Sequence, residues 1–105
     1  MELGENFPRR NLGKYKLFYF MKPLPNTLWR HYKSSGGEDY TYEVLGIAIH
    51  SETQEEMVIY KTLYESRGEN GKLPFPKGTT FVRPLSMWFD MVEWNGNLVW
   101  RFTEM

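Results

Sequence analysis

Two apolar runs between Tyr40 and Tyr64 dominate the hydrophobic pattern of the chain, and a short polar connection, 51–56, separates them. Runs rich in β-branched and aromatic residues and bounded by polar turn residues predict the two strands of a hairpin. In the first run, 40–50, both faces are apolar, which indicates a strand that is covered on both sides. Gly46 lies within this run, and a small residue in a strand is typical of a sharp bend or of close approach by another backbone.

The second run fits two kinds of element. Thr53 followed by Glu56 matches a helix capping box, and Met57 and Tyr60 have helical spacing. The β-branched and aromatic residues of the run favour a strand instead. We predict a strand over 57–64, with a helix as the alternative.

The remaining chain alternates short apolar runs with connections rich in Gly, Pro and Ser. Pro84 cannot continue a ladder but fits the first turn of a helix, so it predicts the end of a strand and one helical turn after it. A loop as long as 66–80 is usually functional or mobile in a compact domain. The predicted elements are a strand 28–33, a loop 34–39, the loop 66–80, a strand 81–83 and a helical turn 85–89.

Asn95-Gly96 predicts a second hairpin, because this dipeptide is a strong signal for a two-residue turn. The turn sets the register of its flanking strands. We expect the aromatic face of this hairpin to face the core and Asp90 and Arg101 to form an outer ion pair, worth about 0–1 kcal/mol. The predicted pairs are Trp94–Asn97, Val92–Val99, Asp90–Arg101, Met91–Trp100 and Phe89–Phe102.

Five or six short strands, one short helical turn and no long helix predict a mostly β domain in the form of a small, strongly bent β-barrel. The 105 residues suffice for one domain with its own core. The segment 1–27 differs from the rest, because Pro23 and Pro25 cannot lie inside a regular ladder. We expect 1–27 to be a partly ordered arm and 28–105 to be the single barrel domain.

Composition excludes several classes of protein. The chain has no Cys, which rules out disulfides and thiolate metal sites and fits a reducing cytoplasm. Its 13 basic and 13 acidic residues give a net charge of zero, so the chain as a whole has no electrostatic attraction to nucleic acid or membrane surfaces. The apolar run 17–21 is too short to span a bilayer. We expect a soluble, cytoplasmic protein that does not contact membranes.

An ordered series of short matches resembles the bacterial domain-of-unknown-function family 1653 and extends over 28–102. The resemblance implies a small SH3-type, or SH3-like, β-barrel and implies no activity. The loops 34–39 and 66–80 are longer than we expect of the family, so a site built from them would not carry over. The matching segments are WRHYK (29–33), YEV (42–44), GIA (46–48), HSET (50–53), VIY (58–60), LY (63–64), VRPL (82–85), Met87 and Arg101-Phe102.

One candidate for chemistry is the polar run His50-Ser51-Glu52-Thr53. It places an imidazole, two hydroxyls and a carboxylate within four residues, as a polar ligand cradle or a general acid or base would require. Ser and Thr also bond backbone amides at turns, and this reading of the run is the stronger one.

Metal and nucleophile chemistry have little support. The pair of His31 and His50 with Glu52 could form an open metal site, but the spacing is not diagnostic. No nucleophile elbow or phosphate-binding loop is present. We therefore predict no metal, no cofactor and no catalytic residue.

The other candidate is a set of basic residues interleaved with aromatic ones, chiefly on the strand 28–33. Cations bind phosphates and aromatic rings stack on bases, so this pattern fits a nucleotide or nucleic-acid surface. Arg83 stands in an apolar run, and its rigid fork fits either a pocket or an ion pair with Glu43 or Glu52. The candidate ligand-binding residues are Arg30, His31, Tyr32, Lys33, His50, Ser51, Glu52, Thr53, Tyr60 and Arg83.

Three functions stay open at this point. The first is a ligand-binding module for a nucleotide or nucleic acid, with an enzyme less expected than a binding protein. The second is a protein or peptide interaction module that uses the long loop and exposed aromatic residues. The third is a small hydrolase-like enzyme centred on His50 and Glu52. The sequence does not indicate the oligomeric state.

Overall fold

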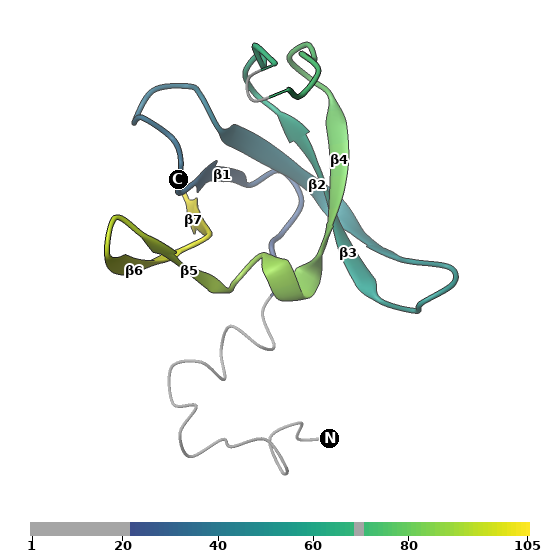
Figure 1. The fold of residues 1–105 in the computed structure, drawn as a ribbon. Helices are drawn as coiled ribbons and strands as arrows, with labels where there is room; N and C mark the ends of the chain where they lie inside the picture. The colour runs from purple at the N-terminus through teal and green to yellow at the C-terminus, as the bar shows by residue number, and fades with distance from the viewer. Residues whose placement is uncertain (1–21, 69–70) are drawn as a thin grey trace.

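The computed structural model describes residues 22–68 and 71–105, and the first 21 residues of the predicted arm lie outside this part of the chain. The described residues form two antiparallel sheets (Figure 1). The larger sheet has the strand order β4-β3-β2-β1-β7, and the smaller one is the hairpin β5–β6. The elements are β1 (Leu28–His31), β2 (Thr41–Ile49), β3 (Glu56–Thr62), β4 (Thr80–Pro84), the 3-10 turn η3 (Leu85–Met87), β5 (Met91–Trp94), β6 (Asn97–Trp100) and β7 (Phe102–Glu104).

The described chain is mostly β, as predicted, but it has seven strands where five or six were expected. The additional strand arises at the C-terminus, where Arg101 interrupts one predicted run. The segment before it pairs within β5–β6, and the segment after it, β7, pairs with β1. The predicted strand 28–33 is also shorter, because the chain turns at Tyr32 and Lys33.

A bulge in β2 changes which side chains face the core. The register with β3 shifts between Val44 and Gly46, so Leu45 has no partner in the ladder and is exposed. Beyond the bulge Ile47 packs against the core that contains Val44, although an uninterrupted alternation would place these two side chains on opposite faces. The irregularity expected at Gly46 is present as this bulge. The strand is covered on both sides only at its start, where Thr41 and Tyr42 are both buried, whereas Leu45 and Ile49 are exposed.

The second run of the central hairpin is a strand, and the helix alternative is wrong. β3 pairs along its whole length with β2 and over 57–61 with β4, and its side chains alternate between the core and the opposite face. Pairing on both sides outweighs the local capping-box signal of Thr53 and Glu56. The helical turn predicted after Pro84 is present as η3.

The Asn95-Gly96 hairpin forms as predicted near its turn. Both turn residues have positive φ, 53° and 81°, and the ladder runs from Trp94–Asn97 to Met91–Trp100. However, Met91 is 38% exposed and Leu98 70% exposed, so the core face predicted for this hairpin is wrong for most of its length. A two-stranded ribbon that extends beyond the main sheet has no layer to cover it.

The base of this hairpin differs from the predicted ladder. Phe102 pairs with His31 in the larger sheet and not with Phe89. Asp90 and Arg101 form a bidentate ion pair with N–O distances of 2.8 and 3.0 Å, and the Arg101 backbone N–H donates to the Asp90 carbonyl. The pair was predicted to be outermost, but both side chains are partly buried, because the chain turns here from one sheet into the other.

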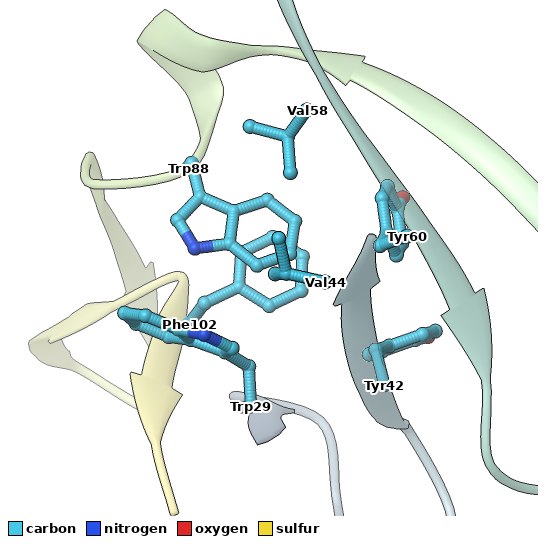
Figure 2. Packing of buried hydrophobic residues seen from close by; sticks show 7 residues of the cluster. All are labelled: Trp29, Tyr42, Val44, Val58, Tyr60, Trp88 and Phe102. Carbon is cyan, nitrogen blue, oxygen red and sulfur yellow. The ribbon is translucent and has the colours of Figure 1, made fainter. Parts of the chain in front are cut away.

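The core is a cluster of mainly aromatic side chains from β1, β2, β3, β7 and the segment after η3 (Figure 2). Trp88 is fully buried and stacks on Phe102 at 4.0 Å and 10°. Trp29 and Tyr60 contact Trp88 edge to face, at 5.6 and 5.1 Å between ring centroids. Such edge-to-face and stacked pairs add to the stabilisation from burial. The buried apolar residues are Trp29, Tyr42, Val44, Val58, Tyr60, Trp88 and Phe102.

Gly68 in the long loop offers a prediction with a matched control. Gly68 and Gly71 both have φ near +75°, but a Cβ on Gly68 would lie 2.8 Å from the Lys72 carbonyl oxygen, whereas a Cβ on Gly71 meets nothing within 4 Å. Gly68→Ala is expected to cost about 1–3 kcal/mol more of unfolding free energy than Gly71→Ala. Chemical denaturation measures both, and equal costs would contradict the close packing at Gly68.

Candidate ligand-binding cleft

A cleft of about 780 Å³ opens between the strands of the larger sheet and the loop that joins β3 to β4. Its volume is in the range of small-molecule sites. Seven aromatic side chains and five cationic ones line it, against two carboxylates. The lining residues are His31, Tyr32, Lys33, Asp39, Tyr40, Tyr42, Tyr60, Tyr64, Glu65, Ser66, Arg67, Lys72, Phe75, Phe81, Arg83 and Arg101.

The register of β3 and β4 places Arg83 in this cleft. Arg83 lies opposite Val58 and Phe81 opposite Tyr60, and both partners are buried. Side chains that pair directly across an antiparallel ladder lie on the same face. Arg83 and Phe81 therefore share the inner face, while Val82 between them is exposed on the outer face.

The guanidinium of Arg83 is held on two sides by neutral groups. Its Nε donates to the Tyr60 hydroxyl at 3.3 Å, and its Cζ lies 5.3 Å from the centre of the Phe102 ring. Neither carboxylate proposed as its partner is used, because Glu43 pairs with Lys61 and Glu52 lies exposed in a turn. Within 22–68 and 71–105 the terminal amino groups of Arg83 have no acceptor, so an oriented cationic fork is available to a ligand.

His31 forms part of the cleft wall beside this fork. Its ring lies 5.7 Å from Tyr40 in a stacked arrangement and 5.1 Å from Phe102 edge to face. Its Nδ1 accepts the Lys33 backbone N–H at 3.2 Å. The pKa of His31 is lowered to about 4, first by burial and then by repulsion from Arg83, Lys33 and Arg101, so the ring is neutral at pH 7.

A tyrosine cluster forms another wall. The hydroxyls of Tyr42 and Tyr64 are 3.2 Å apart, and burial raises the pKa of each above its ordinary value, so both keep their protons at neutral pH. Tyr40 packs against Tyr64 at 5.6 Å and has a φ of +57°. Positive φ is strained for a bulky residue, and such strain is commonly found at functional sites.

The cleft carries a local excess of positive charge, although the net charge of the whole chain is zero. Asp90 neutralises Arg101 through their ion pair. Asp39 accepts a hydrogen bond from the Ser35 hydroxyl, which is the main reason why the pKa of Asp39 lies below its ordinary value. Lys33 lies 6.0 Å from the centre of the Tyr32 ring. The cleft thus combines an excess of positive charge with half-buried aromatic rings, which suits an anionic ligand that carries a planar ring.

Half of the sequence-predicted candidates meet in this cleft: His31, Tyr32, Lys33, Tyr60 and Arg83. Arg30 belongs to the same strand as His31 but is not among the lining residues. Its NH2 group donates to the Gly37 carbonyl at 3.5 Å, toward the loop 34–39.

The other four candidates, His50, Ser51, Glu52 and Thr53, form the β2–β3 turn, which projects at the far end of the hairpin (Figure 1). Seven residues of β2 separate Tyr42 from this end, roughly 23 Å along a strand. The His50 Nδ1 accepts the backbone N–H groups of Glu52 and Thr53 at 3.2 and 3.3 Å. His50 therefore stabilises the turn by accepting backbone N–H groups. This arrangement favours a structural role for His50 over a catalytic role together with Glu52.

Among the described residues, no group of three or more His, Asp or Glu side chains could hold a metal ion. His31 lies in the cleft and His50 in the distant turn, so the metal set considered from the sequence is not assembled. The same part of the chain contains no helix long and apolar enough to cross a membrane.

Sequence reasoning missed the tyrosine cluster and the loop cations. Tyr40 and Tyr42 alternate toward one face at the start of β2, and this period was a usable signal. Arg67 and Lys72 enter the cleft from the loop between β3 and β4. Their position depends on the Ser66–Phe75 bridge, which no local pattern indicates.

Acid is expected to destabilise the fold through His31. Its pKa is about 4 in the folded protein and 6.5 ordinarily, so the unfolded chain binds more protons between these values. The free energy of unfolding therefore falls as the pH drops from 6.5 to 4, by up to about 1.4 kcal/mol per pH unit. Denaturation at several pH values should show a shallower dependence in His31→Gln, whereas His50→Gln serves as the control. Equal slopes in wild type and His31→Gln would contradict the prediction.

The fold and the cleft define a small, mostly β domain with an aromatic and cationic cleft. The model of the family described as Protein of unknown function (DUF1653) matches residues 27–104, and the chain belongs to this family. The family resemblance found in the sequence is thereby confirmed. No curated protein and no solved structure matches the chain.

Proposed function

We propose that this domain is a binding module for a nucleotide or a segment of nucleic acid, held in the cleft between the larger sheet and the β3–β4 loop. The observation that carries the proposal is Arg83, an inward-facing cation that a hydroxyl and an aromatic ring orient and that no carboxylate neutralises within the described chain. Because Arg83 is half-buried and lines the cleft, its terminal amino groups are accessible to an anion.

The surroundings of Arg83 support a ligand of this class. Arg67, Lys72 and Lys33 add cations at the rim, and Tyr32 and Tyr40 offer ring surfaces. Phosphates pair with such cations, and bases stack on such rings at about 1–3 kcal/mol each. A ligand without charge would leave the cations without partners, and one without a ring would leave the aromatic surface unused.

A thermal-shift and calorimetric screen tests the proposal. The probes are the four ribonucleoside 5′-monophosphates, their nucleosides, and short single-stranded DNA and RNA. A ligand that binds only the folded state raises the melting temperature. The expected result is binding of phosphate-bearing probes that weakens steeply with salt. Binding that is equal for nucleosides and monophosphates, or unaffected by salt, would contradict it.

The order of the strands supports an SH3-like barrel as the architecture behind this cleft. The five-stranded sheet bends at the β2 bulge, and its first and last strands in the chain, β1 and β7, are neighbours. A 3-10 turn connects β4 toward the C-terminal strands. Strong bending of a five-stranded meander is what closure of a small barrel requires. Hairpin β5–β6 would then be an insertion before the last strand.

A second candidate function, a protein interaction module, is favoured by hairpin β5–β6. A shallow hollow of about 410 Å³ on it is lined mainly by apolar side chains, including Met91, Trp94 and Leu98. Exposed apolar surface of this kind is typical of a site for an apolar peptide segment. Leu98→Asp should abolish binding of such a partner but leave nucleotide binding intact. Unchanged capture of a protein partner by Leu98→Asp would argue against this second function.

A further inference from the structure

His31 is a nearly buried side chain with one unused hydrogen-bonding nitrogen. It is 9% exposed and lines the cleft. Because Nδ1 accepts the Lys33 backbone N–H, the proton of the neutral ring is on Nε2. In the part of the chain that the structure describes, Nε2 has no protein acceptor, and the buried unpaired side-chain nitrogens are Arg30 Nε and Trp88 Nε1. The Nε2 of His31 therefore reaches the solvent of the cleft.

His31 and Arg83 border the same aromatic ring. The centre of the Phe102 ring lies 5.1 Å from the centre of the imidazole and 5.3 Å from the Arg83 Cζ. The two groups come from strands on opposite sides of the larger sheet, β1 and β4. The bend of that sheet thus brings one neutral donor and one cationic fork to the same region of the cleft.

The number and arrangement of these donors select the shape of the anion. Arg83 has two terminal amino groups in one plane, which satisfy the two oxygens of a carboxylate. A phosphate group has further oxygens out of that plane. The Nε2–H of His31 is one further donor in the cleft, and it comes from a different strand.

We propose that His31 determines specificity in this cleft by donating its Nε2–H to the same phosphate group that Arg83 binds, so that the subsite takes a phosphate ester in preference to a carboxylate. The inference rests on the proposed function and deepens it, because it assigns the anion class and a neutral donor. His31 contributes as an imidazole and not as an imidazolium.

The charged groups around His31 agree with this role. Arg83 from β4, Lys33 from the turn after β1 and Arg101 before β7 all disfavour a positive imidazole. Tyr32 and Tyr40 cover its ring with uncharged surface. A neutral donor adds a hydrogen bond to an anion without adding a fourth cation, so the site keeps its donor across the neutral pH range.

The test compares wild type, His31→Gln, His31→Met and Arg83→Ala by calorimetry at pH 7, with inorganic phosphate, the ribonucleoside 5′-monophosphates and acetate as probes. Gln keeps an N–H donor near the position of Nε2, whereas Met fills a similar volume without one. We expect His31→Met to weaken phosphate-bearing probes about tenfold, with most of the affinity retained in His31→Gln and acetate unaffected. Imidazole ¹⁵N spectra of the wild type should show the Nε2–H tautomer with and without probe. Thermal melts verify that each variant is folded.

The outcomes distinguish a wrong role for His31 from a wrong ligand-binding site. If Arg83→Ala weakens binding but His31→Met binds like wild type, the role of His31 is wrong and the cleft remains the site. If acetate binds as tightly as phosphate, the assigned anion class is wrong. If phosphate-bearing probes bind with no effect of Arg83→Ala, or do not bind the wild type, both the inference and the proposed function are overturned. An imidazolium in the bound state would also overturn the neutral-donor assignment.

Discussion

Replacing Trp88 by alanine is expected to lower the free energy of unfolding by about 3–5 kcal/mol, the usual cost of removing a large buried aromatic ring. Trp88 is fully buried, stacks on Phe102 and contacts Trp29 and Tyr60 edge to face. Its removal leaves a cavity that rings from three strands line, and rigid rings collapse poorly into such a space. For a domain of this size the loss is a large fraction of the total stability.

Two further variants make the Trp88 prediction specific. Trp88→Phe should cost much less than alanine, because it keeps most of the ring and removes an indole N–H that has no acceptor among the described residues. Leu98→Ala, at a residue that is 70% exposed, should change stability by less than about 0.5 kcal/mol. Denaturant unfolding followed by circular dichroism measures all three. A cost for Trp88→Ala no larger than that for Leu98→Ala would contradict the aromatic core.

Replacing Arg83 by alanine is expected to weaken binding of phosphate-bearing ligands by about 10- to 150-fold, which corresponds to the 1.5–3 kcal/mol of charge-assisted hydrogen bonds. The Tyr60 hydroxyl and the Phe102 ring orient the guanidinium, so little entropy is lost when it binds. Arg83→Lys keeps the charge but loses the planar fork and should give an intermediate affinity. Calorimetric titration with the ribonucleoside 5′-monophosphates measures these changes.

Lys61→Ala is the matched control for Arg83→Ala. Lys61 is a cation of the neighbouring strand β3, but it pairs with Glu43 at 3.6 Å and is not among the residues that line the cleft. Its replacement should leave the affinity within about twofold, because exposed ion pairs contribute little. Equal losses in Arg83→Ala and Lys61→Ala would show a general charge effect and contradict a site at Arg83.

The sequence predicted those parts of the fold that local chemistry determines. Asn95-Gly96 set the register of β5–β6 correctly, because positive φ at both positions permits few turns. Pro84 correctly marked the passage from β4 to η3. The strand nature of β3 was also correct, although the capping-box residues offered a helix.

Local sequence patterns did not predict the features that depend on pairing between distant segments. Phe102 was predicted to pair with Phe89, but it pairs with His31, 71 residues earlier, because β7 is an edge strand of the larger sheet. The bulge at Leu45 inverts the predicted faces of β2, and a single extra residue cannot be read from an apolar run. For the same reason the convergence of His31, Tyr60 and Arg83 in one cleft was not predictable from their separate positions.

Chemical-shift mapping by NMR tests the central claim, that the cleft around Arg83 binds the ligand, most directly. The isotope-labelled full chain is titrated with a ribonucleoside 5′-monophosphate that binds in the screen, while backbone amides, the Arg83 Nε–H and the tyrosine rings are followed. We predict the largest changes at Arg83, His31, Tyr32 and Tyr40, with the His50–Thr53 turn unaffected. Changes concentrated in that turn or on hairpin β5–β6, with the cleft silent, would contradict it.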